Sequence, residues 1–245
     1  MTVIDPITEP MTNDEATIIL IPGLMCDRRF WTASLGALSR TRRFVVPTLH
    51  GFDSLAAMAE SILEATEGAL HVVGHSMGGR VALELWDAAP ERVRTLALLD
   101  TGVHGVAADE PARRRFLLDL AESDGMEAVA EQWIPGMIHP DRHDDRRLID
   151  AIAEMVTSYR VDQYVGQVRA LLDRRDAQPI LSTITCPTLV ACGSDDAWSP
   201  PAQHRDIATA IDGARLEIVA ESGHMVAMEQ PEATSRLLST WLETR

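Results

Sequence analysis

The chain has 245 residues, of which 46% are hydrophobic, and a formal net charge of −15 at pH 7. This length suits one larger α/β domain with room for an insertion, and the apolar content excludes a disordered chain. The acidity argues against nucleic acid or an anionic membrane as a partner, and the absence of lysine excludes Schiff-base and P-loop lysine chemistry.

Strands alternate with helices through the first hundred residues. Four strands, counted from residues 17–21, are rich in aliphatic and β-branched residues, and a short additional strand is expected within the acidic leader. These strands are expected at residues 2–4, 17–21, 43–47, 69–73 and 95–100. Apolar residues at helical spacing, with Asp27 and Asp53 or Ser54 as caps, predict the intervening helices. These helices are expected at residues 28–39, 55–63 and 77–86.

The alternation stops after Gly102. Residues 110–176 show only helical patterns, with expected helices at 111–122, 126–133, 144–160 and 161–174. Strands then return at residues 187–192 and 214–219, and helices follow them at residues 202–211 and 232–243.

This order predicts a mainly parallel sheet of about six strands, flanked by helices, with right-handed crossovers. The helical block leaves the carboxyl end of the fourth strand, the edge at which open α/β sheets bind ligands. We therefore expect an α/β core of residues 1–103 and 179–245, and a helical cap over residues 104–178.

A sharp turn joins the third strand to its helix and has a serine at the apex. Gly74 and Gly78 flank Ser76 at two residues on either side, and a side chain at either glycine would collide as strand and helix close. The turn exposes the Ser76 hydroxyl and leaves the amide of Met77 at a helix N-terminus, where an oxyanion can form. Taken alone, the G-x-S-x-G pattern is equally compatible with a plain glycine-rich connection.

A serine nucleophile needs a base and a group that orients the base. His224 is the preferred base among eight histidines, because it follows the last strand on the edge where Ser76 is expected. His50 and His104 also follow strands and remain second candidates, whereas His75 is expected to pack or bond locally. Three others are expected to be solvated: His139, His143 and His204.

The orienting acid should follow a strand that lies between the serine and the histidine in the chain. The loop after residues 187–192 fits, because it holds Asp195 and Asp196, one of which is expected to be only a turn former. Asp100, at the end of the fourth strand, is a rival. The order Ser, Asp, His is the one this geometry has on α/β sheets.

The loop after the first strand offers a second oxyanion donor. Pro22-Gly23-Leu24-Met25 brings the backbone N–H of Leu24 beside that of Met77. Loss of one such donor costs about 3–4 kcal/mol in comparable enzymes. A plain turn is the alternative for Pro22-Gly23, and its place against the serine loop favours the functional interpretation.

Together these loops resemble the α/β-hydrolase superfamily, in its small cap-bearing serine esterase or lactonase branch, from about Thr17 to the C-terminus. The matching segments are the nucleophile elbow (74–79), the acid loop (193–200) and the histidine loop (223–224). The acid-loop match, Gly193-x-x-Asp196-x-x-x-Pro200, implies Asp196 rather than Asp195.

Two features depart from the superfamily pattern. His-Gly often stands in the family where this chain has Pro22-Gly23, so a side-chain contribution is missing although the backbone donor remains. The leader is also too short for the usual first antiparallel hairpin, which is why only about six strands are expected.

The residues imply acyl transfer to and from serine. His224 deprotonates Ser76, which attacks an ester carbonyl, while the amides of Leu24 and Met77 hold the oxyanion and Asp196 fixes the imidazole tautomer. Water then releases the acyl group. The expected substrate is a small or medium carboxylic ester, lactone or thioester, and the mechanism needs no cofactor and no metal.

Substrate choice is expected to lie in the cap and beside the oxyanion loop. Trp133, Met25 and Arg80 are the residues expected to bind substrate, with ordinary helix packing or pairing as the alternative for each. Arg80 follows Ser76 by one helical turn, an arrangement similar to a superfamily branch that performs cofactor-free C–C or elimination chemistry in menaquinone synthesis. That chemistry is the main alternative activity, and a hydrolase-fold ligand sensor is another.

The cysteines and the ends of the chain bear on the compartment. Cys26, Cys186 and Cys192 are spaced for neither a disulfide frame nor a zinc site. Residues 1–15 lack a signal pattern, and no apolar run is long enough to span a bilayer. We therefore expect a cytoplasmic protein with a small-molecule substrate, no nucleic acid and no membrane partner.

Overall fold

The computed structural model describes residues 16–38 and 43–243. The strands are β1 (Thr17–Ile21), β2 (Phe44–Val45), β3 (Leu70–His75), β4 (Val93–Leu99), β5 (Thr188–Gly193) and β6 (Arg215–Val219). Within the described residues they form one parallel sheet in the order β2-β1-β3-β4-β5-β6. The predicted parallel sheet of about six strands is confirmed, and the strand expected at 2–4 lies outside the described residues.

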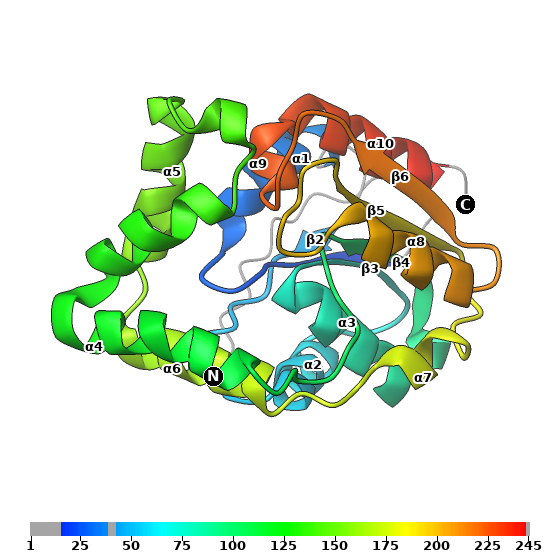
Figure 1. The fold of residues 1–245 in the computed structure, drawn as a ribbon. Coiled ribbons are helices and arrows are strands. Elements are labelled where there is room, and N and C mark those ends of the chain that lie inside the picture. The colour runs from blue at the N-terminus through cyan, green and yellow to red at the C-terminus, as the bar shows by residue number, and fades with distance from the viewer. Residues whose placement is uncertain (1–15, 39–42, 244–245) are drawn as a thin grey trace.

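Helices cover both faces of the sheet, as Figure 1 shows. They are η1 (Arg28–Trp31), α1 (Thr32–Leu38), α2 (Leu55–Glu64), α3 (Met77–Ala88), η2 (Pro90–Arg92), α7 (Gln178–Leu181), α8 (Pro201–Ala210), α9 (Val226–Glu229) and α10 (Pro231–Glu243). Helix α1 packs with α10, and α2 packs with α3. The central strands are therefore buried on both faces, which explains their continuous apolar runs.

The core is divided by the sheet into two apolar clusters. One contains Phe30 and Trp241 beside α1 and α10, and the other contains Met58 and Val81 beside α2 and α3. Helix α2 begins after Ser54, whose side chain accepts a hydrogen bond from the backbone of the first turn. No helix in the described part of the chain combines the length and the apolarity that crossing a membrane requires.

A helical insertion follows β4, as predicted. It consists of α4 (Glu110–Trp133), η3 (Ile134–Gly136), η4 (Pro140–Arg142), α5 (Arg146–Thr157) and α6 (Val161–Leu172). Figure 1 shows α4, α5 and α6 together on one side of the molecule, opposite α8. Two helices were expected where α4 lies, and Gly125 with φ 85° interrupts it between them. The division between core and cap at residues 104 and 178 stays a prediction.

Candidate active site

The serine turn between β3 and α3 is strained and closely packed. Ser76 has φ 53° and ψ −118°, a conformation that non-glycine residues rarely adopt. A Cβ atom at Gly74 would collide with the backbone carbonyl of Gly78, and one at Gly78 would collide with the carbonyl of Ile21. Because backbone atoms cannot move aside as a flexible side chain can, only glycine fits at these two positions.

The end of β4 holds this turn in place. The Ser76 N–H donates to the carbonyl of Leu99 at 2.9 Å, and the Thr101 hydroxyl donates to the carbonyl of Ser76 at 2.7 Å. The backbone N–H of Thr101 donates in turn to Nε2 of His204 at 3.0 Å. The expectation that His204 is solvated is wrong, because this contact buries the ring between α8 and the segment after β4.

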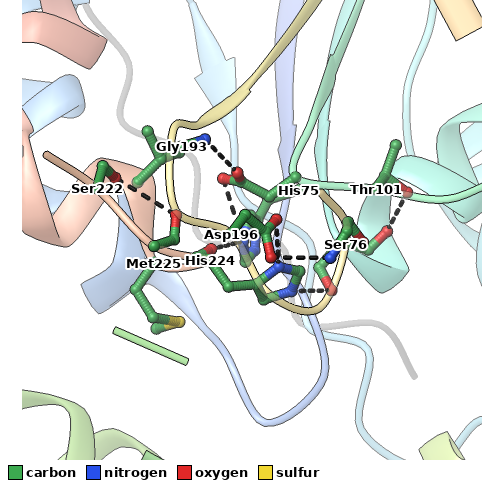
Figure 2. Close-up of polar contacts among 12 residues, drawn as sticks. His75, Ser76, Thr101, Gly193, Asp196, Ser222, His224 and Met225 are labelled. Carbon is green, nitrogen blue, oxygen red and sulfur yellow. Dashed lines mark hydrogen bonds and ion pairs between the residues drawn. The ribbon is translucent and has the colours of Figure 1, made fainter. Parts of the chain in front are cut away.

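Ser76, His224 and Asp196 form a hydrogen-bonded chain, as Figure 2 shows. The Nε2 atom of His224 is 2.8 Å from Oγ of Ser76, and its Nδ1 is 2.8 Å from Oδ2 of Asp196. The backbone N–H groups of Trp198 and Ser199 donate to the other carboxylate oxygen, Oδ1, each at 2.8 Å. This network assigns the Nδ1–H tautomer to His224, so that its Nε2 lone pair faces the serine hydroxyl.

The surroundings of Asp196 favour its ionised form. Burial alone would raise its pKa, but the charge of His224 and the hydrogen bonds from the ring and from the backbone outweigh burial and lower the pKa. A carboxylate at this position can hold the imidazole and stabilise a positive charge on it.

The rival acid and base candidates lie elsewhere. Asp195 is half-exposed and is 3.3 Å from Nε2 of His139 in the cap. His50 packs edge-to-face on the ring of Tyr159, and His104 hydrogen bonds to Gln178. The structure therefore brings Asp196 and His224 to the serine and directs these rivals to other partners.

His75 hydrogen bonds to the histidine loop. It is buried and stacks on Phe30 with ring centroids 4.0 Å apart. Its Nε2–H donates to the backbone carbonyl of His224 at 2.8 Å. Burial, and then the neighbouring His224 ring, lower the pKa of His75 to about 3. His75 is therefore a neutral ring that supports the loop of the candidate base.

The loop after β1 lies directly against the serine turn. A Cβ atom at Gly23 would be 3.1 Å from Cβ of Ser76, so Leu24 follows at the expected edge. Within the described residues, the backbone N–H groups of Leu24 and Met77 have no hydrogen-bond partner. Neither amide is therefore occupied by another group of the described residues.

Two cap residues, Gln167 and Tyr159, hold this loop. Met25 has φ 55°, and its N–H donates to Oε1 of Gln167 on α6 at 3.0 Å. The hydroxyl of Tyr159 donates to the carbonyl of Cys26 at 2.6 Å. Because Gln167 follows Met25 by 142 residues, no local pattern in the sequence could have revealed this contact.

Glu229 holds the histidine loop in a comparable way. This buried carboxylate accepts hydrogen bonds from the backbone N–H groups of Gly223 at 2.9 Å, Met225 at 3.1 Å and His139 at 2.6 Å. Burial raises its pKa, and these three bonds partly offset that effect. Glu229 stands five residues after His224 in an otherwise apolar segment, and this position is the sequence feature that could have indicated its role.

The residues expected to bind substrate have different surroundings. Met25 and Trp133 are both buried in one apolar cluster that joins the core to the cap. Arg80 is half-buried, and its guanidinium donates to the carbonyl of His104 at 2.9 Å. Burial, and then repulsion from Arg174, lower the pKa of Arg80 to about 9. Among the described residues, no group of three or more His, Cys, Asp or Glu side chains is arranged to hold a metal ion.

Comparison with known proteins identifies the family of this chain. The sequence profile described as the Alpha/beta hydrolase family matches residues 18–237. The chain belongs to the alpha/beta hydrolase family. It is accordingly a hydrolase of the α/β fold, and the six-stranded sheet with an insertion after β4 is that fold in this chain.

Three relatives of this alpha/beta hydrolase are informative. RutD of Caulobacter sp. (strain K31), provisionally named a carbamate hydrolase, is 27% identical over an alignment of 251 positions, gaps included, that covers 94% of this chain and 91% of RutD. A Bacillus subtilis (strain 168) protein, provisionally named 2-succinyl-6-hydroxy-2,4-cyclohexadiene-1-carboxylate synthase, is 30% identical over 70% of this chain and 65% of its own. A thermophilic esterase of Thermogutta terrifontis has a TM-score of 0.89 and 26% identity, covering 99% of this chain and 93% of the esterase.

Proposed function

We propose that this chain is a serine hydrolase that cleaves a small or medium carboxylic ester, lactone or thioester through an acyl-enzyme. The observation that carries the proposal is the hydrogen-bonded chain from Ser76 through His224 to Asp196, with the unpartnered amides of Leu24 and Met77 beside it. The esterase of Thermogutta terrifontis, which shares the fold over nearly the whole chain, supports this class of substrate.

Acylation begins with the transfer of the Ser76 proton to Nε2 of His224. The serine oxygen forms a bond to the substrate carbonyl carbon, and the carbonyl electron pair moves onto oxygen. The N–H groups of Leu24 and Met77 donate to that oxyanion, and each is worth about 3–4 kcal/mol by comparison with measured cases. Asp196, at 2.8 Å, stabilises the positive charge on the ring.

Collapse of the tetrahedral intermediate breaks the bond to the leaving oxygen or sulfur. His224 gives its proton to that leaving group, and the acyl group stays on Ser76. A water molecule then repeats the sequence, with His224 as base, the acid as product and Ser76 restored with its proton. The strained φ of Ser76 keeps its oxygen clear of the strand throughout.

The apolar cluster around Met25 and Trp133 supports a substrate with an apolar acyl portion. Met25 adjoins the oxyanion amide of Leu24, and Trp133 ends α4 above the core. We propose that Met25 and Trp133 contact the acyl group of the substrate when it binds under the cap.

A second candidate is cofactor-free elimination or C–C cleavage on a carboxylated substrate. The observation that favours it is the half-buried guanidinium of Arg80, one helical turn after Ser76, together with the provisional name of the Bacillus subtilis relative. The same base would then remove a proton from carbon. Turnover of simple uncharged esters distinguishes hydrolysis from this alternative.

The test is hydrolysis of p-nitrophenyl acetate and butyrate, with a lactone and thioester panel. Ser76→Ala should lower kcat by about 10⁴- to 10⁶-fold, because the nucleophile is lost. The exposed Ser182 supplies the control Ser182→Ala, which should retain full activity. A fluorophosphonate probe should label wild type on Ser76 and leave Ser76→Ala unlabelled.

Two neighbouring aspartates provide a matched pair for the orienting acid. Asp196→Asn should lower kcat by about 10⁴-fold, because the amide cannot hold the same imidazole tautomer. Asp195→Asn should leave kcat unchanged. No turnover of any ester, lactone or thioester by the folded protein would refute the proposed function, and labelling without turnover would indicate a ligand sensor.

A further inference from the structure

Asp100 is a buried carboxyl group that the proposed mechanism does not use. It follows β4 directly, has φ 46° and is 0% exposed. Its backbone N–H donates to the carbonyl of Ala191 at 2.9 Å, and its Oδ1 accepts the N–H of Gly193 at 2.9 Å. Within the described residues, no group donates a hydrogen bond to its second oxygen, Oδ2. A buried carboxylate oxygen without a donor is costly, so this atom needs an explanation.

Among the residues that the structure describes, no arginine forms an ion pair with Asp100 that would balance a negative charge. The nearest ring nitrogen, Nε2 of His75, is 3.9 Å from Oδ2, but its proton is donated to the carbonyl of His224 and the ring is neutral. The acidic groups that act on Asp100 are Asp196 and, more weakly, Glu229. An ionised Asp100 would thus place a second buried negative charge against the carboxylate that orients His224.

Asp196 has a free acceptor site to which a proton on Asp100 could be donated. A carboxylate offers about four acceptor sites, and three on Asp196 are taken by His224, Trp198 and Ser199. The Gly193 N–H that donates to Asp100 stands at the start of the loop that holds Asp196. Burial, the charge of Asp196 and a side-chain hydrogen bond to Asp196 all raise the pKa of Asp100. A protonated carboxyl has one O–H donor and keeps an acceptor oxygen, which matches the Gly193 N–H on one side and Asp196 on the other.

We propose that Asp100 is held as a neutral carboxylic acid whose Oδ2–H donates to Asp196, and that it is a positioning residue for the acid that orients His224. The catalytic part of this inference rests on the proposed function, whereas the protonation state does not. Burial, followed by the negative charge of Asp196, raises the pKa of Asp100 well above its ordinary value, as this arrangement requires. The donated bond favours the charged form of Asp196 and thereby its pairing with His224.

Two substitutions at this position separate the neutral donor from an ionised acid. Asp100→Asn keeps an acceptor for Gly193 and a donor for Asp196 and has nearly the same shape. It should therefore retain kcat/KM for p-nitrophenyl butyrate within about threefold. Asp100→Leu removes the donor, so kcat should fall by about 10- to 100-fold with KM unchanged, and the acidic limb of the kcat/KM profile should move to higher pH.

Infrared spectroscopy tests the protonation state without turnover. At neutral pH the wild type minus Asp100→Asn difference spectrum should contain the carbonyl stretch of a protonated carboxylic acid. The matched control is Asp195→Asn, which replaces a half-exposed aspartate and should not remove that band. If no ester is turned over but the band is present, the proposed function fails and the neutral Asp100 stands.

Three results would overturn the inference. The first is absence of the infrared band from the wild-type protein. The second is a loss of activity in Asp100→Asn as large as that in Asp196→Asn, because the carboxylate at position 100 would then be required. The third is an Asp100→Leu variant with the kcat and the acidic limb of wild type, which would leave no positioning role.

Discussion

Substitution of Gln167 by leucine tests whether the cap positions the oxyanion loop. The change removes the acceptor of the Met25 N–H, a buried group whose loss of a partner costs about 1–3 kcal/mol. Met25 is also held at φ 55°, which costs a non-glycine residue about 1–2 kcal/mol. Without the Gln167 bond, relaxation of Met25 would turn the preceding peptide unit, which contains the Leu24 carbonyl and the Met25 N–H. That movement would be passed to the adjoining peptide unit, which carries the Leu24 N–H.

The size of the effect on catalysis follows from the Leu24 donor. Complete loss of one oxyanion donor lowers kcat by about 10²- to 10³-fold in comparable enzymes. Because the Tyr159 hydroxyl still holds the carbonyl of Cys26 at 2.6 Å, displacement should be partial. We expect Gln167→Leu to lower kcat by about 10- to 100-fold, with KM for an uncharged ester nearly unchanged.

Steady-state kinetics with p-nitrophenyl butyrate, alongside thermal denaturation, measures both parts of this prediction. Arg169→Gln is the control, because Arg169 lies on the same helix, α6, and is exposed. It should match wild type in kcat and in Tm. A Gln167→Leu variant with a lowered Tm and an unchanged kcat would refute the reasoning, since the contact would then stabilise the fold without positioning the donor.

Two further predictions concern buried carboxylates. Burial would raise the pKa of Glu110, but hydrogen bonds from Arg174 and Arg114 lower it from 4.5 to about 2. The Tm deficit of Glu110→Gln, measured in thermal melts, should therefore be full above pH 4.5 and vanish near pH 2. A deficit independent of pH would contradict this. Glu229→Gln places an amide N–H₂ against a backbone donor, so it should lower the free energy of unfolding by about 1–3 kcal/mol in urea denaturation and lower kcat. The exposed control Glu232→Gln should lose neither stability nor activity. Equal stability of both variants would exclude the anchoring role of Glu229.

The nucleophile turn was predictable because its determinants are local. Gly74 and Gly78 stand at fixed spacing from Ser76, and the collisions that exclude other side chains involve atoms of the turn itself and of the adjacent β1. Alternating strands and helices likewise determine a parallel sheet, because the chain can return to the same edge only through a crossover. This rule placed His224 and Asp196 on the edge of the serine, where they lie within hydrogen-bonding distance.

The supporting contacts were not predictable in the same way. Gln167 and His204 act on backbone groups far away in the chain, and nothing in their immediate sequence marks those partners. The position of Glu229 signalled a role near the histidine loop, but not its bond to the backbone of His139. His204 was expected in solvent because it lies on a helix predicted to be exposed or capping, but the buried Thr101 N–H needed an acceptor there. Contacts of this kind depend on how the elements pack.

The sequence by itself determined the parallel sheet, the strained serine turn and the edge at which three loops meet, because short-range sterics and chain connectivity control these features. The family resemblance implied Asp196 over Asp195, but only the tertiary structure showed which carboxylate bonds to His224, and it brought the cap side chain of Gln167 to Met25. It also buried the carboxyl of Asp100 beside the start of the loop that holds Asp196. Hydrogen-bond geometry and the burial of charge depend on neighbours from every part of the fold, and those neighbours exist only once the chain has packed.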